Sequence, residues 1–169
     1  MKDEYFTSLF LKYKNRGLLV DSNILLLYFI GKYSQALITE FKRTRQYTKD
    51  DFYMILNIFS YFKKIVTTPN ILTEISNLSN QLTGRVRSEF YIEFRKQFMI
   101  LSERYLPSQE VSESRYFPSF GLTDSVIIEA AKDNYLVLTD EAQLYRSLLK
   151  EGIDAININH LRAARWFSK

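Results

Sequence analysis

Hydrophobic and polar positions along this chain follow two alternating patterns. Short apolar runs with the length and composition of buried strands stand at residues 18–20, 64–68, 136–139 and 153–158. Between them, apolar positions recur at spacings of three and four, which predicts helices over residues 1–16, 24–33, 50–62, 85–105, 125–132 and 142–150, and a further helix from Pro69. Strands that alternate with helices in this way indicate an α/β fold with a parallel sheet, and right-handed crossovers place helices on both of its faces.

Length and composition fit a single ordered domain over residues 1–169. The chain is 46% hydrophobic and 15% aromatic, which argues against disorder. The stretch 106–120 contains two prolines and is predicted to be a loop, and Trp166 is expected to pack the tail down. No secretory signal is recognisable, and the longest apolar run, Ile24–Ile30, is far shorter than the roughly 20 residues of a membrane span. We therefore expect a cytoplasmic protein with no membrane partner.

The scarcity of cysteine and histidine narrows the available chemistry. With no cysteine and His160 as its single histidine, the sequence excludes a disulfide framework, a thiolate zinc site, a cysteine nucleophile and a His-rich metal site. A Ser-His-Asp triad would depend on this one histidine, which argues against such a triad. Chemistry must then rest on carboxylates, hydroxyls, amides and basic groups.

Acidic residues follow the predicted strands. Asp21 comes directly after the first strand, and Glu74 follows the second after a turn. Asp140 and Glu141 follow the third strand, and Asp124 begins a helix expected to pack beside it. Because ligands of open parallel sheets bind beyond the carboxyl ends of the strands, we expect these five side chains to gather at one edge of the sheet.

Such a gathering of carboxylates predicts a metal site. Converging carboxylates repel one another unless their pKa values rise or a cation binds. Oxygen ligands without histidine or cysteine suit Mg²⁺ or Mn²⁺, and an ion of this kind activates water and offsets charge on a phosphodiester, which is the chemistry of a nuclease. Taken singly, an Asp between a strand and a helix is more often an N-cap worth about 1 kcal/mol, and Glu74 more often a solvated residue. The joint position of the acids favours the site.

Four motifs, in order along the chain, resemble those of PIN domains: residues 18–23, 68–74, 121–124 and 136–141. The resemblance covers residues 17–160, with the helical segments at about 41–62 and 85–105 as elaborations. It implies a three-layer α/β/α sandwich around a short parallel sheet. It also implies a Mg²⁺- or Mn²⁺-dependent nuclease, in a family that acts mostly on RNA and includes the toxins of many toxin–antitoxin pairs.

The resemblance also assigns roles to individual residues. It matches Asp21, Glu74 and Asp124 to the acidic core of the family, Ser22 and Asn23 to the polar residues after the first Asp, and Thr139 to a hydroxyl that steadies the site. The fourth acid of the family often stands two residues after this Thr, which is Glu141 here, whereas Asp140 stands one residue after it. Because adjacent residues leaving a strand point in different directions, one of the two is expected to face the metal.

Exposed bases are candidates for substrate binding. The net charge is +4, and five residues could contact a nucleic-acid backbone: Lys42, Arg43, Arg45, Arg85 and Arg87. A solvated surface is the simpler interpretation of each of them. Tyr47, Phe52 and Tyr53 could stack on unpaired bases, although aromatic residues at helical spacing are more often core. RNA, an antitoxin protein and a second copy of the chain are the partners that the resemblance implies.

Two other function classes compete with a metal-dependent endoribonuclease. The first is a catalytically degenerate PIN-like module that binds RNA or a protein partner, and the presence of the acids argues against it. The second is a phosphohydrolase with an Asp nucleophile. That chemistry usually requires a second Asp two residues after the first, and this sequence has Asn23 at that position.

Overall fold

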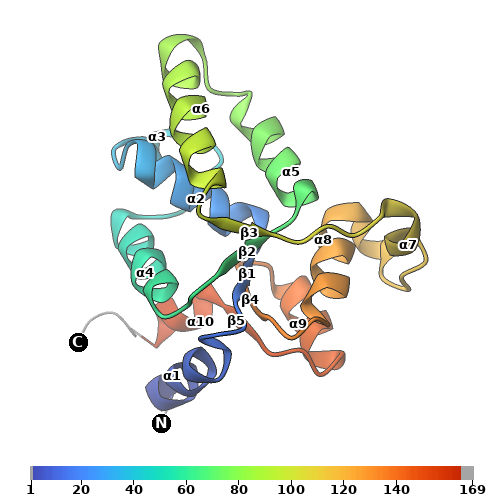
Figure 1. Ribbon diagram of the computed structural model, residues 1–169. Coiled ribbons are helices and arrows are strands. Elements are labelled where there is room, and N and C mark those ends of the chain that lie inside the picture. The colour runs from blue at the N-terminus through green and yellow to red at the C-terminus, as the bar shows by residue number, and fades with distance from the viewer. Residues whose placement is uncertain (1, 165–169) are drawn as a thin grey trace.

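A five-stranded, all-parallel sheet forms the centre of the molecule (Figure 1). The computed structural model describes residues 2–164, so the predicted packing of Trp166 falls outside the described residues. In chain order the strands are β1 Leu18–Val20, β2 Ile65–Thr67, β3 Leu101–Glu103, β4 Leu136–Thr139 and β5 Ala155–Asn157. Their spatial order is β3-β2-β1-β4-β5, which leaves β1 in the middle with a partner on each side. All five carboxyl ends therefore point to the same edge of the sheet.

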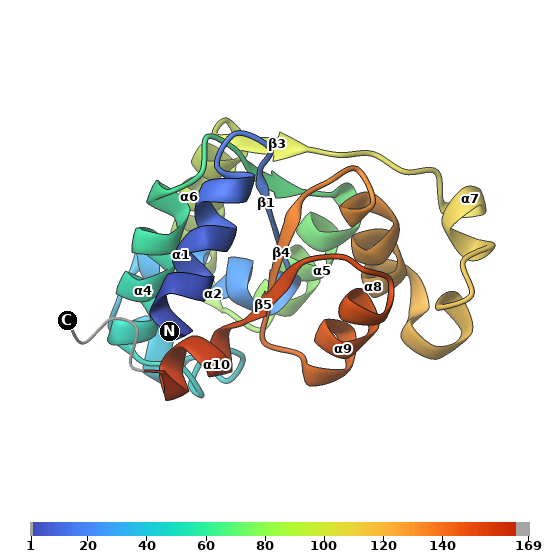
Figure 2. The same cartoon turned by 90° about the horizontal axis from the view of Figure 1, so that it is seen from below.

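Helices cover both faces of this sheet. Their bounds are α1 Lys2–Tyr13, α2 Ser22–Tyr33, α3 Leu37–Glu40, α4 Lys49–Ser60, α5 Pro69–Ser79, α6 Gly84–Phe98, α7 Ser108–Ser112, α8 Phe117–Ala131, α9 Ala142–Lys150 and α10 Ile158–Ala163. In both views α1 and α4 lie on one side of the strands, and α8 and α9 lie on the other (Figures 1 and 2). The architecture is α/β and is consistent with the expected three-layer sandwich. None of the helices within residues 2–164 is long and apolar enough to cross a membrane.

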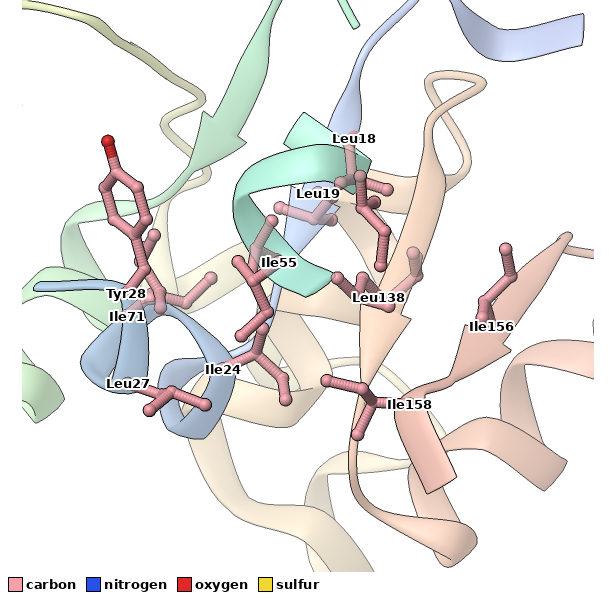
Figure 3. Packing of buried hydrophobic residues seen from close by; sticks show 14 of the residues in the cluster. Leu18, Leu19, Ile24, Leu27, Tyr28, Ile55, Ile71, Leu138, Ile156 and Ile158 are labelled. Atoms are coloured by element: carbon pink, nitrogen blue, oxygen red, sulfur yellow. The ribbon is translucent and has the colours of Figure 1, made fainter. Parts of the chain in front are cut away.

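The core is built from the strands and the apolar helix α2. All three residues of β1 are fully buried, and α2 continues this burial from Ile24 to Ile30. Figure 3 shows side chains from β1, α2, α4 and β4 in one cluster. At Gly31 the α2 backbone lies so close to the buried ring of Phe52 on α4 that an added Cβ would stand 2.5 Å from Cε2. The contact holds α2 against α4.

Three parts of the chain differ from the sequence-based expectation. The helix predicted over 85–105 is wrong beyond Phe98, because residues 101–103 form β3 at the edge of the sheet. Leu101 is half-buried there, so its apolar side chain continued the stripe of the preceding helix without belonging to it. The predicted loop over 106–120 contains the short helix α7 and the start of α8. Residues 41–48 of the helical segment expected at about 41–62 form turns, whereas α4, Lys49–Ser60, agrees with the helix predicted over 50–62.

Candidate acidic site at the carboxyl ends of the strands

Asp21 connects two segments of the site through its buried carboxylate. It ends β1 and caps α2, with Oδ1 accepting a hydrogen bond from the Ile24 amide at 3.0 Å. Its other oxygen, Oδ2, accepts a hydrogen bond from the Asp140 amide at 3.0 Å. Burial and the nearby Asp140 carboxylate raise the pKa of Asp21 well above its usual range, and hydrogen bonding from Thr139 only partly opposes this rise. The residue is thus both a helix cap and an acidic group held in the interior.

Glu74 is brought to Asp21 by the neighbouring serine. Thr68 caps α5 by accepting a hydrogen bond from the Ile71 amide at 3.2 Å, and Pro69 occupies the first turn. This start places Glu74 one turn into the helix. The Ser22 hydroxyl donates to Glu74 Oε2 at 2.8 Å across 52 residues of sequence. Glu74 is therefore a tethered, half-buried residue.

Asp124 reaches the site because α8 is kinked. Gly121 has a φ of 73°, a backbone conformation that few residues other than glycine adopt, and it divides the helix into two segments. Asp124 lies in the first turn of the second segment and is half-buried. Burial and the nearby carboxylates of Glu141 and Glu74 raise the pKa of Asp124 to about 7.

The two adjacent acids after β4 face different surroundings. Asp140 accepts hydrogen bonds from the Tyr47 hydroxyl at 2.5 Å and from the Asn23 side-chain amide at 3.1 Å. Glu141 lies beside Glu74 and Asp124, and burial together with the Asp140 and Glu74 carboxylates raises its pKa. The Glu141 amide donates to the Thr139 hydroxyl at 2.9 Å, which fixes the turn between strand and helix.

The acids enclose a small cavity. Its volume is about 20 Å³, and its walls are Asp21, Ser22, Asn23, Glu74, Asp124 and Glu141. That is room for about one water-sized group. Asp140 does not contribute to the walls, so Glu141 is the residue of the adjacent pair that faces the cavity. Within residues 2–164, however, no three acidic side chains are spaced so as to hold a metal ion in their present positions.

Tyr47 is a component of the site that the sequence did not reveal as such. Its ring is 1% exposed, and its hydroxyl bonds Asp140 across 93 residues of sequence, so it is a core residue and not a stacking surface. The Arg162 guanidinium lies 5.2 Å from the centre of the Tyr47 ring and pairs with the buried Asp51, with Nε to Oδ1 at 2.6 Å. Arg162 and Asp51 thus form a second layer behind Asp140. No local pattern could have shown this layer, because its members come from distant segments.

The five basic residues proposed for substrate binding do not converge on the acids. Lys42, Arg43 and Arg45 are exposed in the turns before α4, and Arg85 and Arg87 are exposed on α6. Arg85 is paired with Glu89 on its own helix, and Arg87 bonds the Asn80 side chain at 2.8 Å. None of the five lines the acidic cavity as the described residues form it.

Comparison of the sequence with models of known protein families finds no match, and comparison with curated proteins finds none either. The chemistry of the site therefore has to be inferred from its own residues.

Proposed function

We propose that this protein is a PIN-like endoribonuclease that uses Mg²⁺ or Mn²⁺. The observation that carries the proposal is the meeting of acidic side chains from four separate segments in one small cavity. Asp21, Glu74, Asp124 and Glu141 all line it, and burial and mutual repulsion raise the pKa of Asp21, Asp124 and Glu141. Holding this many carboxylates together costs stability, and a bound cation would offset that cost.

The oxygen atoms that line the cavity are of the kind that a hard divalent cation binds. The walls present carboxylate, hydroxyl and amide oxygens, and neither histidine nor cysteine contributes to them. Asp21, Asp124 and Glu141 would hold the ion once their side chains move so that their oxygens lie closer together than in the described positions. When bound, the ion supplies an activated water and offsets the charge of the scissile phosphodiester.

The chain's own residues orient the reacting groups. The amides of Ile24 and Asp140 hold the Asp21 carboxylate in a single orientation. The Ser22 hydroxyl holds Glu74, which in this proposal helps to hold the ion or orients the attacking water. Hydrolysis would leave a 5′-phosphate, as the resemblance to PIN domains implies.

Partners follow from the same resemblance. RNA is the proposed substrate, and Lys42, Arg43, Arg45, Arg85 and Arg87 remain candidates for contact with its backbone away from the cleaved bond. An antitoxin protein and a second copy of the chain are proposed partners. A neighbouring reading frame that encodes a small inhibitor of this protein would support the toxin role.

The test replaces the buried carboxylate of Asp21 with an amide. Purified protein should cut an unstructured RNA in the presence of Mn²⁺, and Asp21→Asn should lower the rate about 100-fold or more, because the substitution removes a charge and keeps the cap. Asp50→Asn is the matched control, since Asp50 is an exposed acid in the first turn of α4. Its rate should equal that of the wild type.

A measurement of metal binding distinguishes the proposed nuclease from a catalytically degenerate module. Mn²⁺ should raise the melting temperature of the wild type and of Asp50→Asn but not that of Asp21→Asn, because a ligand stabilises only the state that binds it. Failure of the wild type to cut RNA, or equal cutting by Asp21→Asn, contradicts the proposal. A wild type that neither cuts nor responds to Mn²⁺ is the result expected of a non-catalytic module.

A further inference from the structure

A larger hollow adjoins the acidic cavity. Its volume is about 330 Å³, and it lies between α5 and the segment of α8 that follows Gly121. These two helices are in contact and lie side by side in both views (Figures 1 and 2). Glu74 lines the hollow and also the acidic cavity, so the two spaces share a wall. A molecule held at the acids would extend naturally into the hollow.

The walls of the hollow carry polar side chains that form no hydrogen bonds within the described residues. Asn70, Thr73 and Asn77 come from α5 and Thr123 from α8, and within the described residues none of these four side chains has a hydrogen-bond partner. Other faces of α5 behave differently. Ser76 is hydrogen-bonded to Tyr91, and Ser79 donates to the Ile75 carbonyl at 2.7 Å. Free donors and acceptors on α5 are therefore concentrated toward the hollow.

The charge of the hollow selects against an anion. No Lys or Arg lines it, and Glu74 is the charged residue among its described walls. A phosphate group would meet repulsion there with no compensating cation. Pro69 and Leu122 add apolar surface, and the volume lies at the lower end of the roughly 300–1,000 Å³ usual for small-molecule sites. The hollow thus suits an uncharged group that has both apolar surface and hydrogen-bonding edges.

We propose that this hollow is a nucleobase subsite, which holds the base next to the cleaved phosphodiester. The inference rests on the proposed nuclease function and narrows its substrate to single-stranded RNA, because only an unpaired base can present its edge to side chains in this way. Asn70 and Asn77 each offer a donor and an acceptor, the pair of groups that reads base edges. The enzyme should therefore prefer one base beside the cleaved bond.

The test measures base preference by binding and by cleavage. Four fluorescent RNA octamers are compared: U8 and three octamers in which every second uridine is replaced by A, C or G. Anisotropy in EDTA reports binding, and product analysis with Mn²⁺ reports cleavage. The wild type should favour one octamer about tenfold or more over the least favoured. In the double variant Asn70→Ala/Asn77→Ala this preference should fall to about twofold, while cleavage of the least favoured octamer persists. Asn57→Ala, an exposed Asn on α4, should behave as the wild type does.

The outcomes separate the two proposals. Cleavage without base preference, or with a preference that survives the double substitution, overturns the subsite and leaves the nuclease standing. A preference in binding that depends on Asn70 and Asn77, with no cleavage in Mn²⁺, supports the subsite and contradicts the nuclease. Absence of both binding and cleavage overturns both. Circular dichroism tests whether the double variant is folded. We expect that it is, because both substitutions remove exposed or half-buried side chains from one face of a helix.

Discussion

Asp21 combines two roles that are usually treated as alternatives. Its Oδ1 caps α2, as an Asp between a strand and a helix is expected to do, and its Oδ2 accepts a hydrogen bond from the Asp140 amide. Asp21 also lines the acidic cavity. Glu74 likewise is a helix residue in its first turns and is also tethered to Ser22. At the residue scale, a structural role for a carboxylate therefore does not argue against a functional one.

Asp124 should make the stability of the metal-free protein depend on pH. Its pKa is about 7 in the folded state and about 4 in the unfolded chain. Between pH 4 and pH 7 the folded state holds a proton that the unfolded state lacks. The contribution of Asp124 to stability is therefore greatest below pH 4 and is lost as the pH rises through 7. From pH 5.5 to 7.5 the loss should be about 1–2 kcal/mol, or a few degrees in melting temperature.

Thermal unfolding in EDTA at both pH values measures this loss, with Asp124→Asn as the comparison. The variant should have a smaller pH slope and should be more stable than the wild type at pH 7.5. Asp51 does not disturb the comparison. Burial raises its pKa, but pairing with Arg162 and hydrogen bonding from Thr48 together lower it below the usual value, so Asp51 titrates below this window. An unchanged slope in Asp124→Asn would show that another group causes the pH dependence.

The choice between Asp140 and Glu141 could not be predicted from their own segment. Position after Thr139 is compatible with either residue, and the alternation of a strand says only that they diverge. The deciding partner is the Tyr47 hydroxyl, which engages Asp140 from a turn 93 residues away. By contrast, Asp21, Glu74 and Asp124 could be predicted to approach one another, because each follows a local signal for the end of a strand or the start of a helix.

At the scale of elements, helix starts were more predictable than helix ends. Thr68 and Pro69 begin α5 where the local signals place them. The end of α6 was missed, because Leu101 keeps a helical spacing from Phe98 while it begins the half-exposed strand β3. Edge strands with one partner carry a weaker pattern than central strands, and their assignment depends on that partner.

Gly31→Ala should destabilise the packing of α2 on α4. Alanine favours a helix interior over glycine by about 1 kcal/mol, yet its Cβ would overlap the ring of Phe52, which is 2% exposed and has no room to move. Overpacking of a core typically costs about 1–3 kcal/mol. The net result should be a loss of stability of up to about 2 kcal/mol, measured by urea unfolding.

A double-mutant cycle with Phe52→Leu identifies the cause. Shortening the ring opens the space that the new methyl group needs, so Gly31→Ala should cost less in the Phe52→Leu background. Equal costs in the two backgrounds would mean that the Phe52 contact is not responsible.

For the whole molecule, the α/β class was predictable from the alternation of strands and helices, whereas the order of strands was not. Order depends on which strand pairs with which, and β1 pairs with β2 and with β4, which are distant in sequence. Every residue of β1 and β4 is buried, but so is every residue of the edge strand β5, so burial alone does not identify the central strands. The edge strand β3 has no fully buried residue.

The rate of hydrogen exchange in each strand should reflect its position in the sheet. Amides of β1 and β4 should exchange only when the whole protein unfolds, and those of β3 should exchange about 100-fold faster or more through local opening. Deuterium uptake by peptides that cover each strand measures the difference. Equal protection of β3 and β1 would indicate that the sheet opens as one unit.

The pairing of β1 with β4 also determines when the acidic cavity can exist during synthesis. Asp21 and Asp140, joined through a backbone amide, lie 119 residues apart. At roughly 5–20 residues per second, the ribosome needs about 6–24 seconds to make the intervening chain. Until Asp140 and Glu141 have emerged, Asp21 lacks one of the two amides that orient it and the cavity lacks the wall formed by Glu141. A nascent chain therefore carries an incomplete acidic cavity until residue 141 has been added.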